Sequence, residues 1–355
     1  MPSDLRDVAQ NQAAEQDQTV IEPPSAKLIV RLFLIPLLIV GTAVGVVYLI
    51  SLMAGRNPTI DEAIAGLKSS GGGRTAELMV GPGSKQRYLY AKTLTDQMKQ
   101  GLSLGDRVKL SGQLVDLLDH YTKSDEGEVQ HFLLLALGRC WQVDPEHLQA
   151  DANDSAAARA SAAETLLKYA QSNDIATRKA AMLATVYFKG HEAEVSRFVP
   201  MLAAMVRNSS EDLDVRLAAA TALGPLAPAS DNDALDALRS AVRDSDPKDV
   251  ELVWQAALSL AELGQTDVSD TILKLLSRDE LANTQIYDRE TDPKNPTYRK
   301  LSEAEQERIL VNTMIGVEHY DVPAVQERLK KLSESDPSYR VRAALKSKSA
   351  RDAAP

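Results

Sequence analysis

The sequence is poor in cysteine, with a single residue of this kind, Cys140, in a chain of 355 residues. One cysteine excludes an internal disulfide and leaves the redox compartment open. A lipoprotein signal needs a cysteine directly after its apolar segment, whereas Cys140 lies far downstream. We therefore expect no such signal.

Aromatic residues are also scarce, at 5% of the chain, while alanine is abundant. Sheets are enriched in aromatic and β-branched side chains, and small side chains allow helices to approach closely. The composition therefore favours helices packed on helices.

Positive charge is outweighed by negative charge, with 40 Lys and Arg against 50 Asp and Glu and a net charge of -10. An acidic chain repels the phosphate backbone, and no basic stripe with interleaved aromatic residues is present. We therefore expect no nucleic-acid partner.

The residue types that can hold metals or act in catalysis are present, but they are not spaced as such sites require. The segment from Asp288 to Asn295 resembles a calcium loop only loosely, because Pro293 stands where the turn needs glycine. No histidine stands in a set of ligands at metal-binding spacing, and the chain has five: His120, His131, His147, His191 and His319. We expect no catalytic residue, no metal and no cofactor.

What the sequence does contain is one long apolar run near its start. Twenty-two consecutive uncharged residues extend from Leu32 to Met53. As a helix at about 1.5 Å per residue they span roughly 33 Å, enough to cross a hydrocarbon core of about 30 Å. The run is too long, and the segment before it too acidic, for a cleaved signal peptide. We expect a single transmembrane helix over residues 29–54, after a disordered acidic tail (1–28) and before a linker (55–60).

The basic residues that flank this span are the sequence feature that bears on its orientation in the membrane. Lys27 and Arg31 lie directly before the run and favour a cytoplasmic N-terminus, with the rest of the chain on the other side of the membrane. Lys68 and Arg74 lie within about 20 residues of the exit and act in the opposite direction. Both orientations therefore stay open.

Two glycines inside the run, Gly41 and Gly45, form a small-xxx-small pattern. This pattern lets two spanning helices approach closely. It allows a homodimer formed through the span, although glycine is common in such helices without any pairing role.

Beyond residue 60 the sequence repeats itself. Residues 215–224 match residues 252–261 with their apolar positions in phase, and weaker copies lie near residues 178–187, 129–138 and 87–94. Each copy follows a second amphipathic segment, so the unit is a pair of helices that can bury its apolar stripes only by stacking on its neighbours. We predict an all-α solenoid of about five to six helix pairs over residues 61–347.

The best copy, Asp214-Val215-Arg216 followed by Leu-Ala-Ala-Ala-Thr-Ala-Leu-Gly, resembles the HEAT-repeat signature in the form common in bacterial HEAT-like proteins. In that family an Asp and an Arg at the turn commonly form a ladder between neighbouring repeats. The resemblance therefore implies a structural ladder through Asp214 and Arg216. It also implies a bacterial protein, and hence an anchor in the inner membrane.

The two ends of the array are less regular. Gly71-Gly72-Gly73 and Gly81-Pro82-Gly83 interrupt what should be the first helix of the first pair. The polar stretch 279–299 contains two X-Pro dipeptides and predicts a long loop. Ser302 and Glu305 then form a capping box that opens a helix ending near Val317. Helices near 322–332 and 339–346 close the array, before a disordered C-terminus at 348–355.

Two functions of different classes fit these features. The first is a membrane-anchored, non-catalytic scaffold that binds a protein partner at the membrane, because repeat arrays expose long surfaces. The alternative is an enzyme or enzyme subunit resembling the HEAT-like bilin lyases, with a ligand in the concave groove. That alternative needs acidic and aromatic residues clustered on the second helices, which here are mostly alanine and leucine.

Overall fold

The structure is a computed structural model, and it describes residues 58–68, 83–98, 102–121, 127–142, 155–244, 249–288 and 297–352. The chain divides into two units, residues 1–57 and 58–355, and all of the described residues belong to the second. The predicted tail and span, including Gly41 and Gly45, lie outside the described residues. Among the helices that are described, none is long and apolar enough to cross a membrane.

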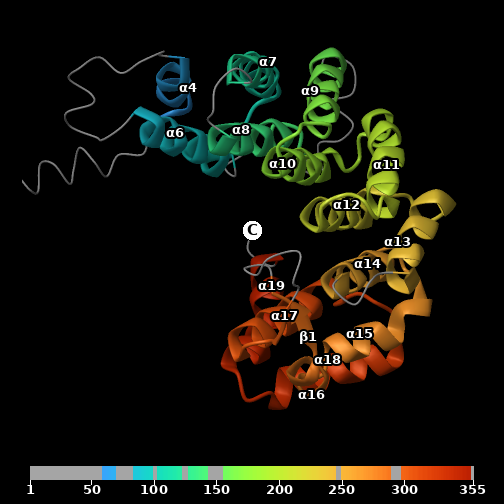
Figure 1. Cartoon of the computed structure of the whole chain (residues 1–355). Coiled ribbons are helices and arrows are strands. Elements are labelled where there is room, and N and C mark those ends of the chain that lie inside the picture. Colours follow the sequence, from blue (N-terminus) through green and yellow to red (C-terminus); the bar gives the residue numbers. More distant parts are fainter. Residues whose placement is uncertain are drawn as a thin grey trace, which may run out of the picture. The chain divides into compact units, whose positions relative to one another are not determined.

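The described residues form successive helix pairs (Figure 1). The first helices of the five N-terminal pairs are α4 (Ile60–Lys68), α7 (Leu104–Tyr121), α9 (Ala156–Tyr169), α11 (Glu192–Arg207) and α13 (Asn232–Asp244). Their second helices are α6 (Gly83–Gln97), α8 (Gly127–Arg139), α10 (Ile175–Thr185), α12 (Leu213–Leu226) and α14 (Val250–Glu262). Each second helix packs on the next in chain order, from α6 to α14, and α7, α9, α11 and α13 do the same in a second layer. The hydrophobic core lies between these two layers.

The C-terminal part continues the stack in a modified form. Its elements are α15 (Ser269–Leu275), α16 (Arg278–Asn283), β1 (Gln285–Tyr287), β2 (Tyr298–Lys300), α17 (Glu303–Gly316), α18 (Pro323–Ser335) and α19 (Tyr339–Asp352). Helix α17 contacts both α14 and α19, and α18 contacts α15 and α19. With α15 and α17 taken as one pair, the described residues form seven pairs rather than five or six.

Alanine lets the second helices approach one another, because its side chain adds little bulk between two backbones. Ala219, Ala220, Ala256 and Ala257 are all fully buried. The hydroxyl of Ser259 on α14 donates to the backbone carbonyl of Ala220 on α12 at 2.7 Å, a contact that brings the two helices close together. Larger side chains at these positions would push the helices apart.

A glycine serves the same purpose between α8 and α10. A Cβ atom added to Gly138 would lie 2.4 Å from the carbonyl oxygen of Ala184. That contact is shorter than any Cβ tolerates, so Gly138 is required for the observed distance between these two helices.

The first pair differs from the sequence prediction. Helix α4 begins at Ile60, where the linker was expected to end, and buries Ala63, Ile64 and Leu67. The glycine-rich segments at 71–73 and 81–83 therefore follow this helix instead of interrupting it, because the apolar stripe that forms the first helix lies upstream of them.

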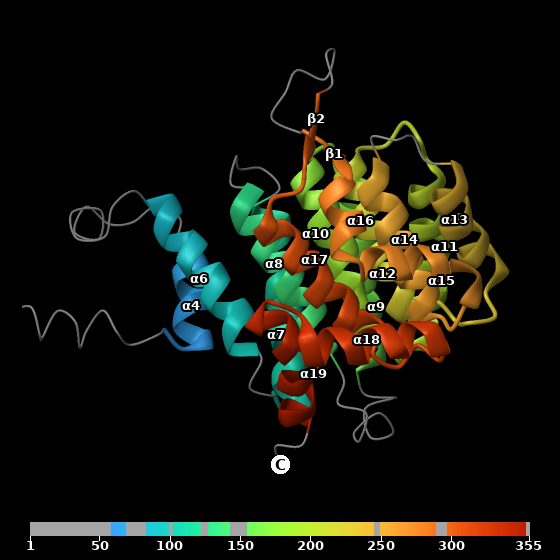
Figure 2. The same cartoon turned by 90° about the horizontal axis from the view of Figure 1, so that it is seen from below.

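The predicted loop over residues 279–299 is wrong in part. Ser277 caps α16 by accepting a hydrogen bond from the backbone N–H of Glu280. The antiparallel strands β1 and β2 follow, with Tyr287 opposite Tyr298 and with Ile286 buried. Figure 2 shows these strands extending beyond the end of α16. The buried Ile286 and the cross-strand pair of Tyr287 and Tyr298 stabilise the ends of this polar segment.

The capping box that opens α17 is confirmed. Ser302 accepts from the backbone N–H of Glu305, and the Glu305 carboxylate accepts from the backbone N–H of Ser302 at 2.9 Å. Leu301 is buried, and the Gln306 side chain donates to its carbonyl at 3.0 Å. The last two predicted helices are present as α18 and α19, and α19 continues to Asp352, past the predicted end of the array at residue 347.

Candidate interaction surface

The second helices present a row of partly exposed, mostly apolar side chains. The row is made by the ninth residue of each of five successive second helices: Leu135 on α8, Leu183 on α10, Thr221 on α12, Leu258 on α14 and Val311 on α17. The hydroxyl of Thr221 donates to the carbonyl of Leu217 at 2.8 Å, which satisfies its hydrogen-bonding need within the helix. We call these five side chains the apolar row. It runs across the helices, so it exists only once the repeats are stacked.

Two further apolar side chains widen the apolar row at its centre. Leu217 and Trp254 are the fifth residues of α12 and α14, and both are partly exposed while packing against the core. Leu258 lies close to α17, because a Cβ atom added to Gly316 would be 3.7 Å from its Cδ2 atom. Ile315, next to this glycine, is 37% exposed. These partly exposed apolar side chains therefore lie on α12, α14 and the adjoining part of α17.

Acidic side chains border this apolar surface. Glu128, Asp214 and Glu251 are the second residues of α8, α12 and α14. Carboxylates at these positions also interact favourably with the helix dipole, which explains them without any ligand. Asp214 is in addition paired with Lys179 at 3.2 Å.

Glu262 is different, because it is the last residue of α14, where the helix dipole disfavours a negative charge. Glu262 is an exposed residue, but partial desolvation of its carboxylate raises its pKa, and the nearby Lys189 opposes this effect only in part. Its carboxylate extends over the backbone of Gly224 on α12, since a Cβ atom at that glycine would lie 2.7 Å from Glu262 Oε2. The helix dipole, which explains the other acidic residues, gives no reason for a carboxylate here.

The residues that were expected to form a ladder contact different repeats. The guanidinium of Arg216 donates to Asp249, directly before α14, at 2.6 Å, and both side chains are buried. Asp214 contacts Lys179 on α10 instead. Arg216 therefore bridges to the following repeat and Asp214 to the preceding one.

A second arginine bridge, which the sequence interpretation missed, lies one repeat earlier. Arg178 on α10 donates to Glu211 at 2.7 Å, and this pair is also largely shielded from solvent. Residues 178 and 216 are 38 apart, and so are residues 211 and 249. This shared offset of both partners is the signal that could have revealed the bridge.

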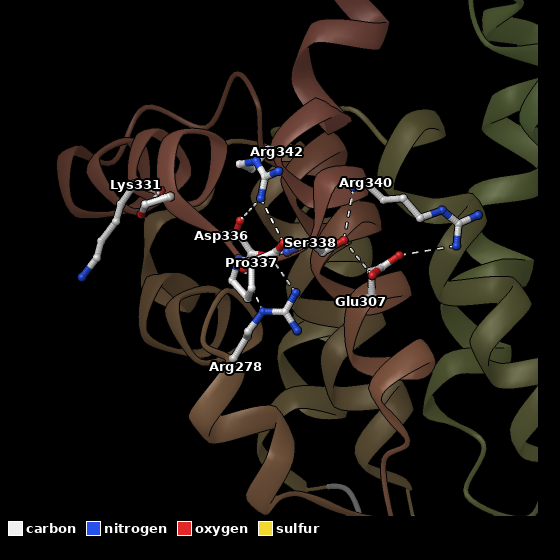
Figure 3. A network of polar contacts seen from close by, with 9 residues as sticks. Arg278, Glu307, Lys331, Asp336, Pro337, Ser338, Arg340 and Arg342 are labelled. Atoms are coloured by element: carbon white, nitrogen blue, oxygen red, sulfur yellow. Dashed lines mark hydrogen bonds and ion pairs between the residues drawn. The ribbon is translucent and has the colours of Figure 1, made fainter.

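A larger polar network closes the C-terminal end of the array (Figure 3). Arg278 on α16 donates to both carboxylate oxygens of Asp336, at 2.8 and 2.7 Å. The backbone N–H of Ser338 also donates to Asp336, at 2.8 Å. Burial acts to raise the pKa of Asp336, but the bonds from Arg278 and Ser338 outweigh it, so this pKa lies below its ordinary value.

The same network joins α17 to α19. The hydroxyl of Ser338 donates to Glu307 at 2.7 Å, and Arg340 donates to the other oxygen of that carboxylate at 3.4 Å. Arg342 donates to the carbonyls of Asp336 and Pro337. Arg178 and Arg216 likewise donate to backbone carbonyls, those of Ser172 and Val206. An arginine that donates to backbone carbonyls is thus common to these three repeats, and at the C-terminal end Arg278 and Glu307 extend the arrangement. We assign a structural role to this network.

The histidines that the structure describes occupy unrelated environments. His131 lies on α8, where burial and the nearby Lys179 lower its pKa. His191 is buried, with its Nε2 atom 3.1 Å from the carbonyl oxygen of Trp141. His120 and His319 are exposed, and His147 lies outside the described residues. Within the described ranges no three His, Cys, Asp or Glu side chains are placed to hold a metal ion.

Cys140 is buried directly after the end of α8, next to the buried Trp141. Burial raises the pKa of its thiol to about 12. At neutral pH the sulfur is therefore protonated, and a protonated thiol is a poor nucleophile and metal ligand.

A profile for HEAT repeats matches residues 199–286, from α11 through β1. No curated protein matches the chain. The match and the stacked helix pairs together support a HEAT-repeat protein, and HEAT repeats form helical repeat scaffolds.

Proposed function

We propose that the protein is a non-catalytic scaffold, tethered to the membrane by residues 32–53, that binds a protein partner through the apolar row and its surroundings. The observation that carries this proposal is the continuation of the row over five helices. Single exposed apolar residues are ordinary on protein surfaces, whereas a contiguous apolar patch is typical of interaction sites. The row has the extended form that repeat proteins use for binding.

The tether has a physical role in this proposal. A protein held at a membrane meets a membrane-bound partner at a much higher effective concentration than the same protein free in solution. The association therefore needs fewer or weaker contacts. The apolar run in the sequence is long enough to supply that tether.

The first experiment tests the apolar row in cells. Chemical crosslinking followed by mass spectrometry identifies the proteins recovered with the full chain. Leu217→Asp and Leu258→Asp place a charge on the surface and should remove the partner. Leu167→Asp is the matched control, because Leu167 is a partly exposed leucine on the first helix α9. Equal loss of the partner in all three variants, or in none, would contradict the proposal.

A second experiment tests the tether and the absence of catalysis. Deleting residues 1–55 should release the array from the membrane fraction and weaken partner recovery. Substituting the exposed His120 or His319 should leave recovery unchanged. If one such substitution abolished function while folding and membrane localisation survived, or if the purified protein absorbed visible light, the scaffold proposal would be replaced by a catalytic or ligand-binding one.

A further inference from the structure

We infer that the exposed side of α6, at the N-terminal end of the array, lies against the headgroup layer of the membrane and binds anionic lipid. The inference rests on the tether of the proposed function, but it concerns a surface separate from the apolar row. It combines three observations: the short connection between the apolar run and the array, the contact of α6 with the start of the array, and the exposed leucine and lysine of α6.

The connection between the apolar run and the array is short. Met53 ends the run, and Pro58, five residues later, is the first residue that the structure describes. Five residues cover at most about 18 Å when the chain is fully extended. The headgroup layer is about 5 to 8 Å thick on each side of the bilayer. A span that ends at Met53 therefore holds Pro58 no more than about 13 Å beyond this layer.

Helix α6 is fixed to this point of the chain. The side chain of Gln97, the last residue of α6, donates to the backbone carbonyl of Pro58. The ring of Tyr90 packs so closely on α4 that a Cβ atom added to Gly66 would lie 2.4 Å from its Cε2 atom. Leu89 precedes Gln97 by eight residues, or about 12 Å along the helix. The tether therefore keeps the outer side of α6 close enough to touch the headgroups.

The exposed side of α6 combines an apolar and a basic side chain. Leu89 is 52% exposed, more than any other leucine or isoleucine that the structure describes. Lys92 is also exposed and lies on the same face of the helix, because it follows Leu89 by three residues. At a membrane interface a leucine can enter the boundary of the acyl chains while a neighbouring lysine extends to the phosphates. A lipid surface therefore suits both side chains.

Charge favours anionic lipid as the occupant. Helix α6 carries three basic residues and one acidic residue, a net charge of +2 in a chain of net charge -10. Helix α10 has the same net charge, but its Arg178 and Lys179 are paired with Glu211 and Asp214. Lys92 forms no ion pair within the part of the chain that the structure describes. An anionic surface attracts such a lysine over about 8 to 10 Å, so acidic residues further along the array are screened from it.

Acidic residues near the same end limit where the lipid contact lies. Asp61 and Glu62 are exposed in the first turn of α4, and Asp96 lies in the last turn of α6. The helix dipole favours the first two, and Glu62 accepts from the backbone N–H of Thr59 at 2.8 Å. Lipid phosphates would repel all three carboxylates. We therefore place the lipid contact at the middle of α6 rather than at these helix ends.

The test measures contact between α6 and the headgroups in the full chain. The protein is placed in nanodiscs of phosphatidylcholine, alone or mixed with phosphatidylglycerol, in which some headgroups carry a nitroxide quencher. Thr93→Cys provides a site for a fluorescent label on α6, and Tyr339→Cys provides one on α19, where the tyrosine is 75% exposed. Cys140→Ala in both proteins leaves the introduced cysteine as the only one.

The label on α6 should be quenched in the mixed lipid and much less in phosphatidylcholine alone, and the label on α19 should be quenched less in both. Lys92→Gln should weaken docking about 5-fold, the effect expected for one basic side chain near an anionic surface. Leu89→Ser should weaken it as well, and so should added salt. Lys331→Gln is the matched control, because it removes an exposed lysine from α18, and it should change nothing.

Three results would overturn the inference: equal quenching of α6 in both lipids, no effect of Lys92→Gln and Leu89→Ser, or quenching that depends on the number of chains per disc instead of lipid charge. The last result would make a second copy of the chain the occupant. Failure of the tether is measured separately, by extraction of membranes with alkaline carbonate. If carbonate releases the chain, the tether and the lipid contact are both wrong. If the chain resists extraction without charge-dependent quenching, only the lipid contact is wrong.

Discussion

The guanidinium of Arg216 and the carboxylate of Asp249 lie 2.6 Å apart, and each side chain is more than nine-tenths buried. The pair joins α12 to the residue directly before α14. Two buried charges offset each other only while both are present. This bridge therefore makes the stability of two repeats depend on each other.

Arg216→Ala should destabilise the array by about 3 to 5 kcal/mol, because it leaves Asp249 buried and unpaired. Replacing both partners, as Arg216→Met with Asp249→Asn, should restore part of the loss. Lys168→Ala is the control, since Lys168 and Asp119 form an exposed pair with 59% of each side chain accessible, and such pairs contribute about 0 to 1 kcal/mol. Urea unfolding of the full chain in detergent measures all three. Equal losses for Arg216→Ala and Lys168→Ala would contradict the interpretation.

Ala220→Leu and Ala257→Leu should each cost about 1 to 3 kcal/mol, because both alanines are fully buried between neighbouring second helices. Ala204→Leu is the matched control on the exposed side of α11 and should change the melting temperature little. The measurement is thermal unfolding followed by far-UV circular dichroism. A control variant that melts as early as the two core variants would mean that the packing register is wrong.

Stability should depend on the ionisation of Glu305 in acid. The Arg299 side chain and the hydroxyl and backbone N–H of Ser302 lower the pKa of Glu305 from 4.5 to about 2. Because the folded pKa lies below the unfolded one, this stabilisation is present above about pH 4.5 and is lost as the pH falls towards 2. The difference in melting temperature between the wild type and Glu305→Gln should therefore shrink over this range. A difference that stays constant from pH 6 to pH 2.5 would show that ionisation is not involved.

Cys140 should resist thiol reagents in the folded protein. The thiol is buried and its pKa is raised to about 12, so at pH 8 the reactive thiolate is far rarer than for an exposed cysteine. Labelling with a maleimide should be slow in buffer and fast in urea, and one label per chain is expected because the chain has one cysteine. Rapid stoichiometric labelling of the folded protein would place Cys140 at the surface.

Some features were predictable because their residues are neighbours in the sequence. The capping box needs only Ser302 and Glu305, three residues apart, and the apolar period of each helix lies within a few turns. The repeat offset that aligns Leu217 with Trp254 is also visible in the sequence, because it reflects a copied unit. Helix pairs, their approximate order and the HEAT-like class follow from such local or periodic patterns.

Other features depend on which segments the stacking brings together. Asp336 is 58 residues from Arg278, so this partner could not be chosen before the helices were placed. The two ends of the predicted loop form the strands β1 and β2, and Ile286 is buried on β1. Its burial depends on the helices that surround it. The apolar row combines residues of five helices, and the carboxylate of Glu262 on α14 lies beside Gly224 on α12. Both features therefore depend on how the helices stack. A sequence determines which faces are apolar, whereas the contacts between faces are decided by the free energy of packing the whole array, to which every repeat contributes.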